Sequence, residues 1–323
     1  LSSNKNQTNS GDNLEPVVSI IMNCYNGEYY LREAIDSVIA QSYQNWELIF
    51  WDNQSTDKSK AIFDYYNDSR LKYYFAPEHT ALGVARERAF KHLSGDFIAV
   101  LDSDDIWFPE KLEKQLKLFI DRDVGIVISD AIFFNQFDER ILYGEIFPPE
   151  GKVFRELMTG YFVTLTTVML RKSVVDKLEY GFDSDFSYIA DFDLVLRTAQ
   201  ISKLAVCKEV LAKWRAHEES DSWQSFVSFS IERERWIEKQ IKYNFNSNFA
   251  NEYQDEISAL HSKNFLDMAF SALLESKHIK AIKLISKTNF KDWRDFVILF
   301  CCFIPFSNII LLRLQMRRVR LLK

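Results

Sequence analysis

One stretch of the sequence decides the fold, namely Asp96-Phe97-Ile98-Ala99-Val100-Leu101-Asp102-Ser103-Asp104-Asp105. Its five apolar residues run into three carboxylates within four positions. The length and composition of the apolar run predict a fully buried strand, and the acids follow where that strand ends. In an open α/β sheet, ligands bind at the carboxyl ends of the strands. We therefore expect a ligand site at this edge of the sheet.

The acids Asp102, Asp104 and Asp105 favour a bound divalent cation. Bunched carboxylates repel one another unless a cation joins them. Mg²⁺ and Mn²⁺ prefer oxygen ligands and usually bind through one or two carboxylates plus substrate phosphates. The alternative is an acidic turn that leads into the next helix, because Asp is a common cap and turn residue.

Composition limits the class of protein. The 323 residues suffice for one large domain or for one domain with a helical appendage. A net charge of −6 argues against a nucleic-acid partner. The four cysteines (Cys24, Cys207, Cys301 and Cys302) have no metal-type spacing, which predicts a reducing, cytoplasmic compartment. Residues 1–15 are polar, unlike a signal peptide, and we expect them to be disordered.

Apolar patterns alternate between strand and helix through the first part of the chain. Predicted strands are residues 17–22, 46–51, 71–75, 96–101 and 124–129, and predicted helices are 28–41, 58–66, 79–93 and 109–121. Short strand–helix units of this kind predict an α/β fold with a mostly parallel sheet covered on both faces. Further on we expect strands at 141–147, 163–170 and 204–214 and a helix at 190–200, followed by helices at 231–243, 252–275 and 278–286.

The end of the chain is apolar and then basic. Residues 296–312 are almost wholly apolar, interrupted by Pro305, Ser307 and Asn308, and five basic residues follow without an acid. Seventeen helical residues span roughly 25 Å, less than the roughly 30 Å of a bilayer's hydrocarbon core. We expect this segment to contact a membrane surface, with its arginines meeting anionic head groups at the inner face of the membrane. The alternative is a final helix packed on the domain.

Three common nucleotide or hydrolase motifs are absent. No G-x-G-x-x-G follows the first predicted strand, and neither G-x-x-x-x-G-K-[ST] nor G-x-S-x-G occurs anywhere. A nucleotide-binding sheet without these glycine loops has to handle phosphate in another way. We expect a metal ion held by the acids at residues 102–105 to bind the phosphate groups instead.

Five segments resemble the family 2 glycosyltransferases. They are VSIIMNCYNGE at 18–28, AIDSVIAQSY at 34–43, WDNQSTD at 51–57, GVAR at 83–86 and SGDFIAVLDSDD at 94–105. The last contains the D-x-D motif of the family. The fourth departs from the family pattern, since Glu87 stands where Asn is usual. The resemblance covers roughly residues 16–217, and five motifs in the right order make it specific.

The resemblance implies a fold called GT-A and transfer of a sugar from a nucleoside diphosphate to an acceptor. It implies that Asp52 binds the base and that Asn23 and Tyr25 line the base and ribose. It also implies that Arg86 reaches the nucleotide side of the donor. Asp102 would contact the ribose, Ser103 would also bind the nucleotide sugar, and Asp104 would hold Mn²⁺ or Mg²⁺ on the diphosphate. Asp105 would cap the turn or support the site from behind.

The acceptor base is expected at the start of a helix, in the segment YIADFDLVLR at 188–197. The family places an Asp there after a Glu, but Ala190 replaces that Glu. Asp191 is the expected base, with Asp193 in reserve. A helix N-terminus favours an ionised carboxylate, as a base requires, although acids are common at helix starts without any catalytic role.

The segment WRAH at 214–217 resembles the later R-x-H segment of the family. His217 is expected to contact the metal or the diphosphate, and Arg215 to brace that region. A structural histidine is the alternative.

These observations predict an inverting, metal-dependent glycosyltransferase of surface-glycan synthesis. The expected donor is a UDP-sugar by default, and the expected acceptor is a glycan or a lipid-linked sugar. The expected parts are a tail at 1–15, a GT-A domain at 16–218 and a helical extension at 219–323. A nucleotidyltransferase and a non-catalytic nucleotide-sugar-binding domain remain as alternatives, the latter because of Ala190.

Overall fold

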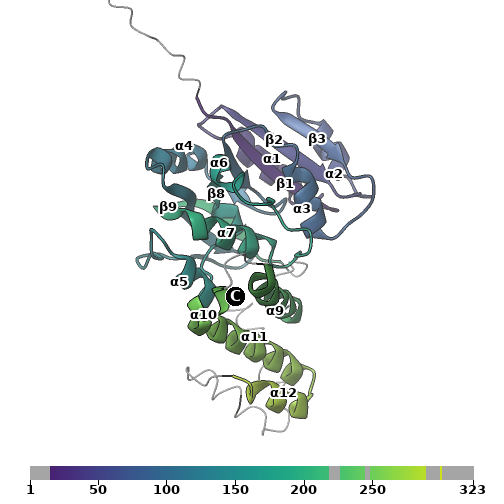
Figure 1. Cartoon of the computed structure of the whole chain (residues 1–323). Coiled ribbons are helices and arrows are strands. Elements are labelled where there is room, and N and C mark those ends of the chain that lie inside the picture. The colour runs from purple at the N-terminus through teal and green to yellow at the C-terminus, as the bar shows by residue number, and fades with distance from the viewer. Residues whose placement is uncertain (1–14, 218–225, 244–247, 289–298, 300–323) are drawn as a thin grey trace, which may run out of the picture.

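The computed structural model describes residues 15–217, 226–243, 248–288 and 299. Within them a nine-stranded mixed sheet has the strand order β3-β2-β1-β4-β8-β6-β9-β5, with β7 on β6 (Figure 1). The strands are β1 Val18–Cys24, β2 Trp46–Asp52, β3 Leu71–Phe75, β4 Phe97–Val100, β5 Ile106–Trp107, β6 Val124–Phe134, β7 Glu139–Ile141, β8 Met169–Arg171 and β9 Lys203–Arg215. The longer ladders, β1 with β2 and β6 with β9, are parallel, as predicted for the sheet.

Helices cover both faces of this sheet (Figure 1). They are α1 Leu31–Ile39, α2 Ser59–Asp64, α3 Leu82–Phe90, α4 Lys111–Leu116, α5 Phe154–Thr159, α6 Lys172–Val175 and α7 Ala190–Ile201, with 3-10 turns η1 Lys117–Ile120 and η2 Leu165–Thr167. Side chains of β2 alternate between two cores. Phe50 packs in the core under α1 and α2, whereas Ile49 and Trp51 pack in the core under α3 and α7.

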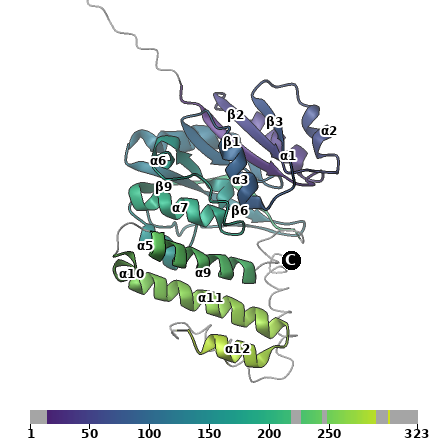
Figure 2. The same cartoon turned by 45° about the vertical axis from the view of Figure 1, so that its right-hand side comes forward.

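The extension consists of α9 Phe226–Tyr243, α10 Phe249–Glu252, α11 Gln254–Leu274 and α12 His278–Ile285. Figure 2 shows α7, α9, α11 and α12 as successive layers below the sheet. Trp236 and Ile237 of α9 are buried in the same core as Phe192 of α7. The predicted boundary near residue 218 lies outside the described residues and stays a prediction, but the hydrophobic core continues from one side of it to the other.

Two predicted strands are wrong. In the predicted strand at 141–147, only Ile141 belongs to a strand, β7. Tyr143 and Gly144 instead donate their backbone N–H groups to the Asp130 carboxylate, at 3.0 and 3.1 Å, and Gly144 has a φ of +63°. The turn is stabilised because this carboxylate holds two successive amides.

In the predicted strand at 163–170, residues Leu165–Thr167 form η2 and only Met169 and Leu170 are in β8. The Thr167 hydroxyl donates to the Thr164 carbonyl at 2.7 Å, and the Thr167 amide donates to the same oxygen at 2.9 Å. Local hydroxyl–backbone bonds of this kind compete with sheet pairing.

Two predictions concern residues that the structure does not describe. Residues 1–14 of the predicted tail and the apolar segment at 296–312, apart from Leu299, lie outside the described residues. In the part of the chain that is described, no helix combines the length and apolar character needed to cross a membrane.

Candidate active site

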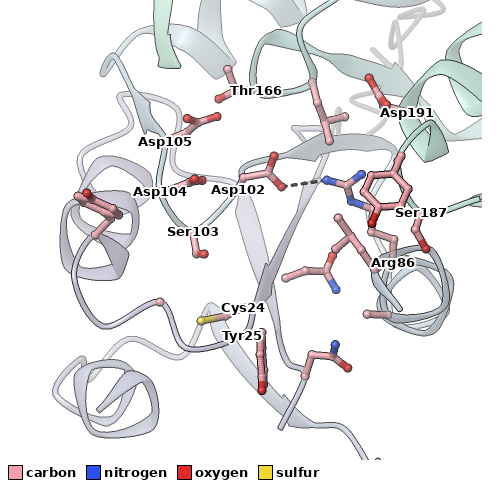
Figure 3. A pocket seen from close by; sticks show the side chains of 18 of the residues that line it. Cys24, Tyr25, Arg86, Asp102, Ser103, Asp104, Asp105, Thr166, Ser187 and Asp191 are labelled. Atoms are coloured by element: carbon pink, nitrogen blue, oxygen red, sulfur yellow. Dashed lines mark hydrogen bonds and ion pairs between the residues drawn. The ribbon is translucent and has the colours of Figure 1, made fainter. Parts of the chain in front are cut away.

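A cleft of about 660 Å³ opens at the carboxyl ends of β1, β2 and β4, as the sheet topology predicts (Figure 3). One side is lined by the turns after these strands, with Thr166 of η2 next to Asp105 (Figure 3). The other side is lined by α3, by the segment before α7 with the start of α7, and by Phe229 of α9. Its lining includes Asn23, Tyr25, Asn53, His79, Arg86, Asp102, Ser103, Asp104, Asp105, Thr166, Ser187, Tyr188, Asp191, Trp214, His217 and Phe229.

The part of the cleft at the carboxyl end of β1 offers an aromatic face and a side-chain amide without a hydrogen-bond partner. The rings of Tyr25 and His79 lie 4.2 Å apart, and Tyr25 is half exposed. Asn23 is 9% exposed, and both polar atoms of its side chain are buried without a hydrogen-bond partner. A buried amide without a partner is costly unless a ligand or water completes it. This part of the cleft suits a flat ring with polar edges.

Asp52 does not line the cleft, contrary to the sequence prediction. Its carboxylate is fully buried and accepts hydrogen bonds from the Ser55 amide at 2.7 Å and the Tyr73 hydroxyl at 2.6 Å. Asp52 projects to the same face of the sheet as Phe50, because strand side chains alternate. Asn53, the next residue, lines the cleft instead, and its side chain exchanges hydrogen bonds with the backbone of Thr80.

Arg86 lies where the sequence predicts, in α3 beside the cleft. Its guanidinium donates to Asp102 Oδ1 at 3.0 Å, and its Nε is buried without a partner (Figure 3). Close packing explains why this motif has a glycine at position 83. A Cβ at Gly83 would lie 1.9 Å from the Phe186 carbonyl oxygen, so only glycine allows this approach. The close contact joins the helix that carries Arg86 to the segment that precedes α7.

Asp104 and His217 meet, although 113 positions separate them. His217 Nε2 lies 2.8 Å from Asp104 Oδ2. The meeting follows from β5, which pairs with β9 and brings the residues after β9 to the acidic turn. Arg215 braces this turn, since its backbone N–H donates to Asp105 at 2.8 Å and its Nε donates to the Asp104 carbonyl at 2.7 Å. Asp105 thus supports the turn from behind.

Mutual repulsion and the low polarity of their surroundings disfavour the ionised forms of Asp102, which is partly exposed, and of Asp105, which is buried. Burial raises the pKa of Asp102, while the Arg86 guanidinium opposes the rise and the carboxylates of Asp104 and Asp191 add to it. Burial raises the pKa of Asp105 well above its usual range, with Asp104 and Asp102 adding to the effect. A cation bound at this turn would relieve the repulsion among the ionised acids.

Asp191 lies in the opposite wall, in the first turn of α7 (Figure 3). The Tyr161 hydroxyl donates to Asp191 Oδ2 at 3.0 Å. The reserve candidate Asp193 is excluded by position. It is fully buried away from the cleft, where Arg197 Nε and Trp236 Nε1 donate to its carboxylate at 2.9 and 3.0 Å. Successive helix positions two apart face different directions, which separates the two acids.

Comparison with known proteins identifies the family. The model of glycosyl transferase family 2 matches residues 19–179. The UDP-Glc:alpha-D-GlcNAc-diphosphoundecaprenol beta-1,3-glucosyltransferase WfgD of Escherichia coli is 30% identical over 210 residues, which cover 65% of this chain and 81% of WfgD. The chain belongs to glycosyltransferase family 2. The putative teichuronic acid biosynthesis glycosyltransferase TuaG of Bacillus subtilis is 31% identical over 169 residues, covering 52% of this chain and 67% of TuaG.

Solved structures show that this glycosyltransferase has the GT-A fold. S. aureus TarS 1-349 in complex with UDP-GlcNAc superposes with a TM-score of 0.56, at 17% identity, over 83% of this chain and 88% of TarS. The mannosyltransferase PcManGT from Pyrobaculum calidifontis, in complex with GDP-Man and Mn²⁺, gives 0.61 at 15% identity, over 89% of this chain and 79% of PcManGT. At these identities the likeness concerns the fold alone.

The candidate metal ligands of this glycosyltransferase suit an ion whose remaining coordination positions are filled by the substrate. The described residues contain no group of three His, Cys, Asp or Glu side chains arranged to hold an ion. Asp104 and His217 supply two adjacent ligand atoms. Mg²⁺ is usually held by one or two carboxylates together with substrate phosphates and water. The site therefore fits an ion that binds together with a diphosphate.

Several residues of the site were missed by sequence reasoning. Asn53 directly follows Asp52, and the one sequence feature that separates the two residues is that Asn53 lies one position past the end of β2. Tyr161, which donates to Asp191, lies in a distant segment and belongs to no motif. Phe229 lines the cleft from the extension, in a helix whose apolar pattern alone suggests a core position. A periodicity argument cannot separate a core aromatic from one that borders a cleft.

Proposed function

We propose that this glycosyltransferase transfers a sugar from a nucleoside-diphosphate donor to a hydroxyl acceptor with inversion at the anomeric carbon. The observation that carries the proposal is the arrangement of one cleft. The Asp104–His217 pair stands on one wall, and Asp191 stands on the other. A diphosphate site and a single base on opposite sides suit direct displacement by the acceptor.

The donor nucleotide is proposed to lie along β1. Tyr25 and His79 offer a stacking face for the base, and the unpaired amide of Asn23 offers a donor and an acceptor for the base or ribose. Asn53 replaces Asp52 in our proposal for the base-binding residue. Arg86 and Asp102 would bind the ribose or the diphosphate together, since each already orients the other, and Ser103 would lie beside them.

Asp104 and His217 would hold Mn²⁺ or Mg²⁺ at the diphosphate. When bound, the ion neutralises the negative charge that grows on the leaving diphosphate, which stabilises the transition state more than the ground state. The chain's own part is to keep these two ligands in place. Arg215 does so by bonding to both Asp104 and Asp105.

Asp191 is proposed as the base that accepts the proton of the attacking hydroxyl. Its carboxylate lies in the first turn of α7, at the positive end of the helix dipole. Tyr161 fixes one carboxylate oxygen by its hydrogen bond, which leaves the other for the acceptor. Fixed geometry of this kind is a large part of what general-base catalysis requires.

The acceptor is proposed to be a lipid-linked sugar, met at the inner face of the membrane. The name of WfgD states a diphosphoundecaprenol acceptor, and the apolar and basic end of this chain suits a membrane surface. Deletion of residues 296–323 should reduce binding to vesicles of anionic lipid without changing nucleotide binding. Unchanged vesicle binding would contradict this part of the proposal.

Calorimetric titration with UDP, GDP and dTDP, each with and without Mn²⁺, tests the donor site. We expect one diphosphate to bind only with metal, and Asp104→Ala to abolish that binding. Asp191→Asn should keep donor binding and lose transfer by about 10²–10⁴-fold, the usual share of a general base. Asp64→Ala, an exposed acid paired with Lys60 outside the cleft, is the control.

Metal-independent binding in wild type, or unaltered metal-dependent binding in Asp104→Ala, would contradict the metal role. Full transfer activity in Asp191→Asn would remove Asp191 as the base.

A further inference from the structure

Glu232 of α9 fills a concave arrangement of backbone amides just ahead of α7. Its carboxylate accepts the N–H groups of Ser187 at 3.0 and 3.1 Å, of Tyr188 at 2.8 Å and of Ile189 at 3.1 Å. Glu232 is 7% exposed. Successive backbone N–H groups that converge on one point form an anion site, and bonds to an ionised acceptor are stronger than neutral ones. In this fold the anion is a side chain of the same molecule.

The segment that Glu232 holds is part of the cleft. Ser187 and Tyr188 line it, and Asp191 follows Ile189 by two residues. On its other side the segment touches α3, where the Gly83 amide donates to the Ser187 hydroxyl at 3.3 Å. Glu232 therefore holds this segment in place beside α3. Movement of the segment would displace both the wall of the cleft and the start of α7.

Two further contacts of α9 act on the same region. Phe229, one turn before Glu232, packs edge-on against Tyr188 with ring centroids 5.5 Å apart. Trp236, one turn after Glu232, donates to Asp193 on α7. Residues three and four apart share one face of a helix, so α9 presents these three side chains together. Glu232 does not itself line the cleft and can act only through the backbone that it binds.

We propose that Glu232 is a positioning residue that fixes the acceptor wall of the cleft and, through it, Asp191. The inference rests on the proposed function in that Asp191 is taken as the base. It gives the extension a part in catalysis, because a carboxylate from α9 orders the segment before a helix whose own first residue is Ala190. Within the part of the chain that the structure describes, Glu232 hydrogen-bonds to residues 187–189 and to no residue assigned here to the donor.

The test compares Glu232→Ala, Glu232→Gln and the control Glu234→Ala. Glu234 lies on the same helix and binds His261 and Asn264 of α11, each at 2.7 Å. Amide hydrogen exchange should become about tenfold faster or more at residues 187–189 in Glu232→Ala. The effect should be smaller in Glu232→Gln, whose amide oxygen still accepts, and absent in Glu234→Ala.

Transfer kinetics give the second readout. We expect kcat to fall about tenfold or more in Glu232→Ala, to recover in part in Glu232→Gln, and to change less than twofold in Glu234→Ala. The donor KM and the calorimetric nucleotide affinity should stay within twofold in all three. A merely structural role would lower both donor binding and turnover.

Unchanged exchange at residues 187–189 in Glu232→Ala overturns the inference, whatever the enzyme transfers. Unchanged kcat in Glu232→Ala, with wild type active, also overturns it and leaves the proposed function standing. A wild type that binds nucleotide and transfers no sugar counts against the proposed function, and exchange then still decides whether Glu232 orders the segment.

Discussion

Lys111 is a cation buried at the start of α4. Its side chain is fully buried, its Nζ donates to Gln115 Oε1 at 2.6 Å, and it lies 4.2 Å above the ring of Trp107. Burial lowers the pKa of Lys111 to about 7, with a small opposing effect of the neighbouring Cys207. No carboxylate compensates this charge within the contacts that the structure gives it. The residue therefore makes folding depend on pH.

The sign follows from proton counting. In the unfolded chain Lys111 has a pKa of about 10.4. Between pH 7 and pH 10 the unfolded state thus holds more protons, and the free energy of unfolding rises with pH. We expect wild type to gain about 2 kcal/mol relative to Lys111→Met between pH 7 and pH 9. Urea unfolding at pH 7, 8 and 9 measures this difference.

Lys117→Met is the matched control, since Lys117 is an exposed residue of η1 that pairs with Glu113. Its stability should follow that of wild type at all three pH values. Parallel curves for wild type and Lys111→Met would show that Lys111 does not titrate on unfolding in this range.

Adjacent residues also set the limit of sequence reasoning about the site. The motif at residues 51–57 predicted a base-binding residue, and the structure places Asn53 rather than Asp52 in the cleft. The choice depends on which face of β2 each side chain takes. Both faces of β2 are buried, so its apolar run carries no alternation that would reveal the direction. The acidic turn at 102–105 was predictable because it follows the carboxyl end of a buried strand, β4.

At the scale of elements, α3 and the segment before α7 depend on one glycine. A Cβ at Gly83 would lie 1.9 Å from the Phe186 carbonyl oxygen and 3.3 Å from that of Asp183. Gly83→Ala should therefore push α3 outward and destabilise the protein by about 1–3 kcal/mol, as overpacking does. Because α3 carries Arg86, nucleotide affinity should fall too. Urea unfolding and calorimetry measure the two effects.

Gly160→Ala is the control for backbone effects, because its added Cβ would meet only the Glu156 carbonyl oxygen, at 3.8 Å. Its stability and nucleotide affinity should match those of wild type. If Gly83→Ala is as stable as wild type and binds nucleotide as tightly, the prediction is wrong. The segment before α7 would then shift to accommodate the added methyl group without loss of folding free energy.

Element prediction succeeded where periodic burial dominates and failed where side chains bind the backbone. The helix at 190–200 and the strand at 204–214 match α7 and β9 within a residue. The 163–170 segment has strand-like residues, but its threonines close the turn η2. The bond that closes the turn at 143–144 reaches back to Asp130, so no local pattern contains it.

At the scale of the whole molecule, the extension and the sheet share one hydrophobic core. Trp236 of α9 is fully buried in the core that contains Phe192 of α7 and Ile128 of β6. Its ring packs edge-on against Phe192 at 5.2 Å, and its Nε1 donates to Asp193. The sequence predicts the helices of the extension but not this contact. The helical spacing of apolar residues shows which face of a helix is buried, and it does not show which element that face packs against.

A shared core predicts one cooperative unfolding transition. Trp236→Ala should cost about 3–5 kcal/mol, the usual effect of truncating a buried aromatic residue, and should leave the Asp193 carboxylate without one donor. The lost stability belongs to the sheet and the extension alike. We therefore expect the whole transition to shift down together, by circular dichroism and by thermal loss of nucleotide binding. Ile279→Ala, on the exposed side of α12, should leave both curves in place. Two separate transitions in Trp236→Ala, with nucleotide binding lost only at the wild-type temperature, would mean that the sheet holds its fold without α9.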